Sequence, residues 1–164
     1  MENTNSISQL SNIVIQKSKL IYEFVNLYNR YAGISRDYGN GEEITMSEAH
    51  TLEVIGEHPE ITITELSKIQ HKTTGAVAQI ITKLDQKDYL IRSPHKNNKK
   101  KVCYSLSSKG QELIRYHRQF DIAKFSDLLA SLMQEYSQED LDLFFRIIES
   151  YNKAIEKRIA IKNN

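Results

Sequence analysis

Residues 62–106 read TITELSKIQHKTTGAVAQIITKLDQKDYLIRSPHKNNKKKVCYSL, and the order of the patterns in this stretch decides the fold. Thr62 and Glu65 have the spacing of a capping box, which predicts that a short helix begins there. Thr73 is a second capping residue, and it predicts another helix over about 74–88. The stretch therefore begins with two short helices joined by a tight turn.

Each of these two helices has one apolar side and one polar side. The expected buried positions are Ile63, Leu66 and Ile69 in the first helix, and Ala76, Val77, Ile80, Ile81 and Leu84 in the second. At 100° per residue, the opposite side of the second helix carries Gly75, Gln79, Thr82 and Gln86, with Lys83 at its edge. The second helix thus presents a polar surface outward.

The residues after the second helix change from a helical period to alternation. Residues 89–95 and 100–106 suit two strands, and Lys96-Asn97-Asn98-Lys99 supplies the turn between them. Two helices followed by a hairpin with a basic tip predict a winged helix-turn-helix.

Working outward, the flanking sequence predicts further amphipathic helices. Residues 6–32 carry an apolar stripe, and glycines between 33 and 41 mark a loop. Thr45 or Ser47 can cap the next helix, which Gly56 and Pro59 end.

Two more helices are expected after the hairpin, over about 109–133 and 138–160, the last capped by Ser137. The fold class is therefore mainly α, a winged helix-turn-helix with a two-stranded β-wing and N- and C-terminal dimerisation helices. We assign 44–108 to DNA binding, and 1–35 with 109–164 to dimerisation, because these helices are more apolar than a small winged domain needs.

The composition fits a globular chain, with 40% apolar and 26% charged residues in 164. The N-terminus has no basic start followed by an apolar run, so neither a signal peptide nor a membrane span is expected. A single cysteine, Cys103, cannot form an internal disulfide, which favours a cytoplasmic location. No nucleophile elbow, phosphate-binding loop or carboxylate pair is present, so an enzyme is not expected, nor is a cofactor.

Charge is concentrated in the middle of the chain. Nine lysines and arginines between Thr62 and Lys101 face only three acids, a net charge of +6, while the rest of the chain carries −5. A basic block between acidic flanks indicates a surface for a polyanion, although a solvated charged face would give the same count.

The second helix of such a motif reads DNA in the major groove, where Gln pairs with adenine and Lys reaches guanine or phosphate. The wing lysines are placed to grip phosphates or a flanking minor groove. Gly75 either lets the backbone approach DNA closely or is merely tolerated near the helix start. The candidate DNA-binding residues are Thr62, Thr64, Lys72, Thr73, Thr74, Gly75, Gln79, Thr82, Lys83, Lys96, Asn97, Asn98, Lys99 and Lys100.

These motifs together resemble the multiple-antibiotic-resistance regulator (MarR) family. The matching pieces, in order and with near-family spacing, are Thr45 to His50, Ile63 to Ser67, Val77 to Leu84, Tyr89 to Arg92, and Leu106 to Gly110. The resemblance implies a homodimeric regulator on double-stranded DNA, binding a pseudo-palindromic operator, with a small-molecule or oxidation signal. The family usually has Asp-Arg-Arg in the wing, where this chain has Asn98-Lys99-Lys100, so wing binding should be more electrostatic and the usual wing ion pair is in doubt.

Signals for an effector are weaker. The stretch Ser47 to Gly56 resembles the subgroup that represses fatty-acid synthesis genes and senses acyl chains. Candidate ligand-binding residues are Phe24, Tyr28, His50 and His117, each of which would serve equally well as core. No histidine has a partner at the i+3 or i+4 spacing of helical metal sites, so no metal is expected, although His50 and His117 could still converge between the dimerisation and DNA-binding parts. Cys103 is interpreted as an ordinary strand cysteine.

Three function classes follow. The favoured one is a sequence-specific transcription regulator, a repressor released by a small ligand. A non-specific architectural DNA-binding protein is the alternative that the lysine-only wing supports. A protein-interaction adaptor using the same fold without DNA is the third, and the basic block argues against it.

Overall fold

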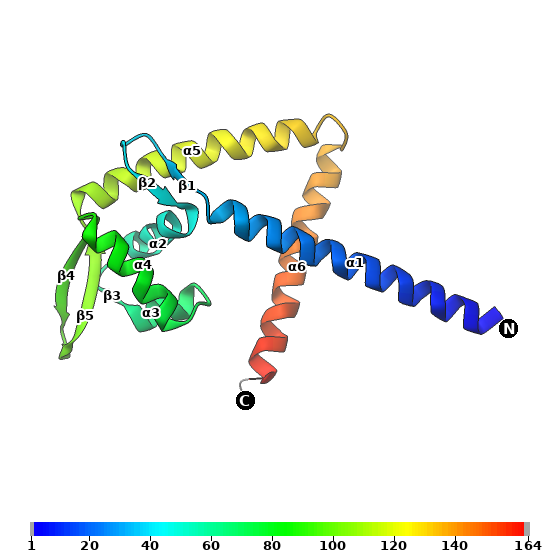
Figure 1. The fold of residues 1–164 in the computed structure, drawn as a ribbon, viewed down its shortest axis with the longest axis horizontal. Helices are drawn as coiled ribbons and strands as arrows, with labels where there is room; N and C mark the ends of the chain where they lie inside the picture. The colour runs from blue at the N-terminus through cyan, green and yellow to red at the C-terminus, as the bar shows by residue number, and fades with distance from the viewer. Residues whose placement is uncertain (1, 163–164) are drawn as a thin grey trace. The chain divides into compact units, whose positions relative to one another are not determined.

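The computed structural model describes residues 2–162, with side chains from 11 to 161, and it is mainly helical (Figure 1). The elements are α1 (Glu2–Ala32), β1 (Ser35–Asp37), β2 (Glu43–Thr45), α2 (Met46–Glu57), β3 (Ile61–Thr62), α3 (Ile63–Ile69), α4 (Thr74–Gln86), β4 (Leu90–His95), β5 (Asn98–Leu106), α5 (Ser108–Leu132) and α6 (Gln138–Lys162). The chain forms two compact units, which meet in sequence between Arg118 and Gln119 within α5. The predicted fold class is confirmed in its order of elements.

Side-chain caps determine where the short helices of the first unit begin. Thr62 and Glu65 form the predicted capping box of α3, with the Thr62 N–H donating to the Glu65 carboxylate at 2.9 Å. Of the two candidate caps for α2, the structure uses Thr45, in a second capping box with Glu48. Thr73 caps α4 by accepting from the N–H of Ala76 at 3.2 Å.

Apolar side chains of α2, α3, α4 and the first turns of α5 make the core of the first unit. Two buried positions were predicted wrongly. Ile69 is 44% exposed, because it is the last residue of the seven-residue α3 and lies at the rim. Ala76 is exposed because it lies in the first turn of α4, before that helix enters the core at Val77. The fully buried aliphatic residues of the core include Ile44, Leu52, Ile55, Leu66, Val77, Leu84 and Leu113.

The wing is the hairpin β4–β5, and it belongs to a three-stranded antiparallel sheet of order β3-β5-β4. The turn is shorter than predicted, because His95 pairs with Asn98 and leaves only two residues between the strands. Asn98 and Lys99 therefore lie on β5. Strand β3 was not predicted, because it has only two residues, the second of which, Thr62, is the cap of α3, and so it shows no alternation.

A second small hairpin, β1–β2, occupies part of what was predicted as a loop. The Asp37 carboxylate accepts from the N–H groups of Gly39, Asn40 and Gly41 at 2.7–3.0 Å, which organises the connection. Gly39 and Gly41 both have positive φ, a conformation that glycine adopts without strain. Strands of three residues are too short for a periodic signal, so the sequence did not reveal them.

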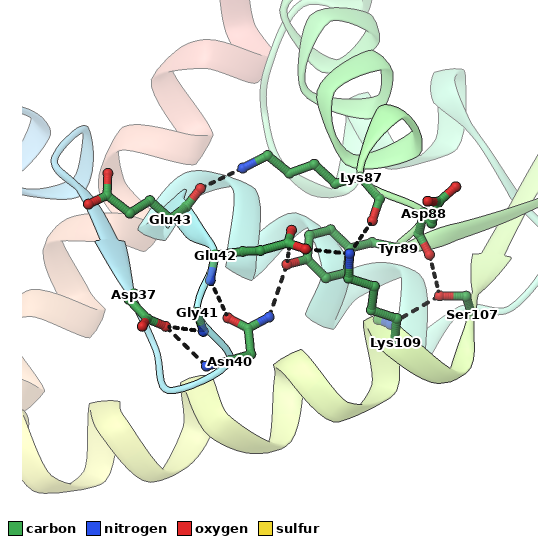
Figure 2. A network of polar contacts seen from close by, with 11 residues as sticks. Asp37, Asn40, Gly41, Glu42, Glu43, Lys87, Asp88, Tyr89, Ser107 and Lys109 are labelled. Atoms are coloured by element: carbon green, nitrogen blue, oxygen red, sulfur yellow. Dashed lines mark hydrogen bonds and ion pairs between the residues drawn. The ribbon is translucent and has the colours of Figure 1, made fainter.

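Tyr89 is the centre of a polar network that ties this hairpin to the base of the wing (Figure 2). Its side chain is fully buried, and its hydroxyl donates to Glu42 at 3.0 Å and accepts from the Asn40 amide at 3.0 Å. The Lys109 ammonium donates to Glu42 at 2.5 Å and to the Lys87 carbonyl at 2.9 Å. One buried ring thus links β2, the end of α4 and the start of α5.

Removing the Tyr89 hydroxyl should weaken the first unit in a pH-dependent way. Burial, and then the hydrogen bond to Glu42, raises the pKa of Tyr89 to about 12, against a partly compensating bond from Asn40. Because the folded-state pKa is raised, the neutral phenol stabilises the fold fully below about pH 10, and that contribution is lost as pH rises through 12. We expect Tyr89→Phe to lower the free energy of unfolding by about 1–2 kcal/mol at pH 7. Above pH 10, the stability of the variant should fall less with pH than that of the parent.

Urea unfolding at pH 7 and pH 11 measures this effect, with Tyr22→Phe as the control because that ring is 72% exposed. Equal unfolding free energies for Tyr89→Phe and the parent at pH 7 would contradict the network's structural role.

The second unit consists of the C-terminal part of α5 and all of α6. Ser137 caps α6 as predicted, accepting from the N–H of Asp140 at 3.2 Å while its own N–H donates to the Asp140 carboxylate. Of the described helices, none combines the length and apolar character needed to cross a membrane.

Candidate nucleic-acid interface

Helices α3 and α4 form the helix-turn-helix. They pack against each other and are joined by a tight turn. The Lys72 N–H donates to the Ser67 carbonyl at 3.0 Å and thereby closes the end of α3. His71 has φ of 51°, so one left-handed residue is enough to reverse the chain. Thr73 then starts α4 with its outward face away from the core.

The outward face of α4 carries most of the predicted base-reading residues. Thr74, Gly75, Gln79 and Thr82 are all exposed, in agreement with the helical projection, and Thr64 of α3 is exposed as well. Thr62 is the exception. Its side chain is 8% exposed, and its hydroxyl donates to Glu65 at 2.7 Å, so the structure gives it a capping role instead of a place on the surface.

Several polar groups on this surface already have partners within the chain. The Thr82 hydroxyl donates to the Ala78 carbonyl at 2.9 Å, and Lys83 lies 3.4 Å from Glu48. The Lys72 ammonium donates to the Ser47 hydroxyl at 2.9 Å, and partial burial lowers its pKa. Within the described residues the Gln79 amide makes no such bond, so its donors and acceptor remain available to an external partner.

The wing brings its basic residues to one exposed tip. The Asn97 N–H donates to the His95 ring at 3.2 Å, and the Lys100 N–H donates to the Asn98 side chain at 3.1 Å, which shapes the turn. Lys96 pairs with Glu60 at 2.9 Å, and this hydrogen bond raises its pKa. Lys99 and Lys100 are exposed and have no ion pair to another described residue.

An ion pair that the sequence did not indicate braces the wing against α4, beside which the hairpin lies (Figure 1). Arg92 of β4 binds both carboxylate oxygens of Asp85, at 2.9 and 2.5 Å. The wing therefore has an ion pair that braces it, although its two residues lie outside the wing motif in which the family's usual pair was expected. No regular spacing connects a helix residue to a strand residue seven positions on, so sequence alone gave no signal for it.

Gly75 has no role in packing, and this allows a test of the two interpretations left open above. A Cβ added at Gly75 would meet nothing within 4 Å. Because alanine is favoured over glycine in helices, Gly75→Ala should raise the unfolding free energy by about 0.5–1 kcal/mol. If the bare backbone serves close approach to DNA, the same variant should lower affinity for duplex by about tenfold or more.

Chemical denaturation and a DNA titration on the same preparation check both parts. A variant that is more stable and binds duplex as tightly as the parent would show that Gly75 is merely tolerated.

The candidate ligand residues form two pairs in the first unit. Phe24 and Tyr28 stack on α1 with ring centroids 6.2 Å apart, and both are half exposed. His50 of α2 and His117 of α5 lie edge to face at 5.0 Å, with His117 fully buried. Cys103 is 2% exposed and burial raises its pKa, which makes its thiol a poor nucleophile.

Comparison with known proteins agrees with this geometry. Residues 44–102, the span from β2 to the wing, match the profile of the MarR family. The helix-turn-helix and wing of this chain are thus similar to those of the MarR family. The profile covers the two capping boxes, the helix-turn-helix and the wing tip, and it leaves out the long helices on either side.

Two related proteins match a longer part of the chain than the family profile does. The chain is 28% identical over 105 residues, 64% of its length, to an uncharacterized HTH-type transcriptional regulator, YhjH, of Bacillus subtilis. It is 23% identical over 112 residues to the HTH-type transcriptional regulator PchR of the same organism. The chain spans 59% and 65% of the lengths of these two relatives.

Solved structures share the fold of residues 44–102 together with the helices on either side. A mutant of MarR from E. coli, complexed with operator DNA, gives a TM-score of 0.66 at 21% identity, covering 85% of this chain and 96% of that one. Streptococcus pneumoniae FabT in complex with DNA gives 0.62 at 22% identity, covering 88% and 96%. At these identities the likeness establishes the fold.

Proposed function

We propose that this protein is a DNA-binding transcription regulator that reads a specific operator as a homodimer. The observation that carries the proposal is the exposed polar face of α4 beside a wing whose Lys99 and Lys100 have no ion pair within the described chain. A helix of this kind fits the major groove, while the wing reaches the backbone or the minor groove. Similar structures that were solved with DNA bound support it.

Specific reading would depend on Gln79 above all. Its amide can hold adenine through two hydrogen bonds, whereas Thr82 offers a methyl group and an acceptor. Thr74 and Lys83 lie on the same face. The Lys83 side chain pairs at 3.4 Å with the nearly buried Glu48, but it is itself 65% exposed and so placed to reach a base or a phosphate.

Dimerisation through the regions 1–35 and 109–164 is supported by exposed apolar surface. In the second unit, α6 has six large apolar residues that are 40–56% exposed, and an open apolar hollow of about 490 Å³ lies at its start. A single chain would leave these groups in water, which is costly, and a two-fold copy would cover the same face on both chains. These six residues are Leu143, Phe144, Ile147, Tyr151, Ile155 and Ile159.

We further propose repression that a small ligand relieves. The family resemblance supports a ligand-responsive output, and the stretch Ser47 to Gly56 favours an acyl chain as the signal. The pairs Phe24–Tyr28 and His50–His117 are the residues we assign to this ligand.

Selection of bound fragments from a random duplex library tests the proposal. The parent protein should enrich pseudo-palindromic sites with half-sites about one helical turn apart, as a two-fold dimer requires. Gln79→Ala should lose preference at one position in each half-site, a change of about 1–3 kcal/mol in discrimination. Gln86→Ala, at the far end of the same exposed face, is the matched control.

Two other outcomes would replace the proposal. Equal binding of all duplexes, with no enriched sequence, would favour the architectural protein that the lysine-only wing permits. Failure to retain duplex even at low salt would favour a protein-interaction adaptor.

A further inference from the structure

Three potential metal ligands meet in the first unit, where α2 lies against the first part of α5. His50 and Glu53 come from α2 and His117 from α5, and one ligand atom from each lies within 4.8 Å of the others. We propose that these three side chains bind a divalent transition-metal ion of the Zn²⁺ class. This site goes beyond the proposed function and does not depend on DNA binding. It gives His50 and His117, named above as ligand-binding candidates, to the ion and leaves Phe24 and Tyr28 to the small ligand.

Two helices of fixed geometry bring the ligands together. His50 and Glu53 are three residues apart, so they project from the same side of α2. The imidazole of His117 faces them from α5, 5.0 Å from the His50 ring between centroids and 3.8 Å from the Glu53 carboxylate at Nδ1.

The donor atoms suit Zn²⁺ chemistry. Two histidines with one glutamate form a known zinc ligand set, and a tetrahedral ion would keep a fourth position for water. Bonds of about 2.0–2.2 Å place tetrahedral ligand atoms about 3.3–3.6 Å apart, so the widest pair must approach by roughly 1.5 Å at most. His50 and Glu53 are partly exposed and have room to rotate toward the ion.

The surroundings hold the third ligand in place. His117 is 1% exposed, and the ring of Tyr38 packs against it at 4.7 Å. The Arg118 guanidinium donates to Glu53 at 3.2 Å, and the remaining lone pairs of that carboxylate stay available to an ion. Because the two α2 ligands are partly exposed, an ion can enter from that side.

The histidines show no metal-ligand spacing along any one helix, which is why the sequence predicts no metal. Convergence of His50 and His117, which lie 67 positions apart, was left open, but nothing in the sequence indicated that Glu53 would join them. Only the packing of α5 on α2 makes the cluster visible.

Titration of the full chain with Zn²⁺, followed by calorimetry, tests the proposal, and Co²⁺ provides a visible spectrum. We expect one ion per chain and a four-coordinate Co²⁺ spectrum without a thiolate charge-transfer band, because Cys103 is not a ligand. His50→Gln and Glu53→Gln should each weaken binding at least tenfold, since losing even an outer-shell partner costs about 10–100-fold. His58→Gln, which removes an exposed histidine elsewhere, should bind as the parent does.

The buried His117 needs a measurement that leaves the protein intact, because its substitution threatens the fold. In side-chain NMR spectra of the parent, Zn²⁺ should shift the imidazole signals of His50 and His117 and leave those of His58, His71 and His95 unchanged. Zn²⁺ affinity that is retained in both His50→Gln and Glu53→Gln, or the absence of saturable binding, would overturn the proposal and leave an ordinary histidine–glutamate contact.

Discussion

Gly110→Ala should destabilise the first unit by about 3 kcal/mol, at the upper end of what overpacking costs. A Cβ at Gly110 would lie 2.4 Å from the carbonyl oxygen of Tyr89 and 3.3 Å from the Leu106 side chain. The carbonyl of Tyr89 also accepts from the Ser107 N–H at 3.0 Å, so this backbone cannot move without losing that bond. Alanine at this position would push the start of α5 away from the base of the wing.

Urea unfolding followed by circular dichroism measures the loss. Gly75→Ala is the matched control, because the same added methyl group meets no atom within 4 Å there. An unfolding midpoint for Gly110→Ala equal to that of the parent would mean that α5 is not packed against Tyr89 as described.

Replacing Lys99 and Lys100 together with alanine should produce the largest loss of DNA affinity among the wing variants. Both ammonium groups are exposed and have no ion pair within the described chain, so each is available to a phosphate. The logarithmic salt dependence of binding changes by about 0.9 per phosphate contact. The double variant should therefore flatten the slope by about 1.8 per chain, and lower affinity for specific and random duplexes alike.

Binding isotherms at several salt concentrations give the slope directly. Lys96→Ala is the control from the same tip, because Lys96 is already paired with Glu60 and should change the slope less. If the double variant shows the same salt dependence of binding as the parent, the wing does not contact the DNA backbone.

Much of the fold follows from local signals in the sequence. The capping pair Thr62–Glu65 and the cap Thr73 mark the starts of α3 and α4, because cap chemistry depends on residues three apart. The exposed face of α4, with Gln79 at its centre, follows from the helical period alone. These features need no knowledge of distant contacts.

The features that sequence reasoning missed depend on segments far apart in the chain. Strand β3 exists because β5 provides its partner, and the cluster at His117 exists because α5 packs on α2. The brace between Arg92 and Asp85 likewise needs the wing to fold back beside α4. The burial of Thr62 shows the converse error, since a residue type suited to DNA contact was already engaged in capping.

The Arg92–Asp85 brace also has a consequence for the kinetics of recognition. A wing fixed to its neighbouring helix loses little conformational freedom when both meet a duplex, so less entropy opposes association. Such preorganisation is expressed mainly in a slower dissociation rate. If the chain binds an operator as proposed, we expect it to remain there longer than a protein with the same contacts and an unbraced wing.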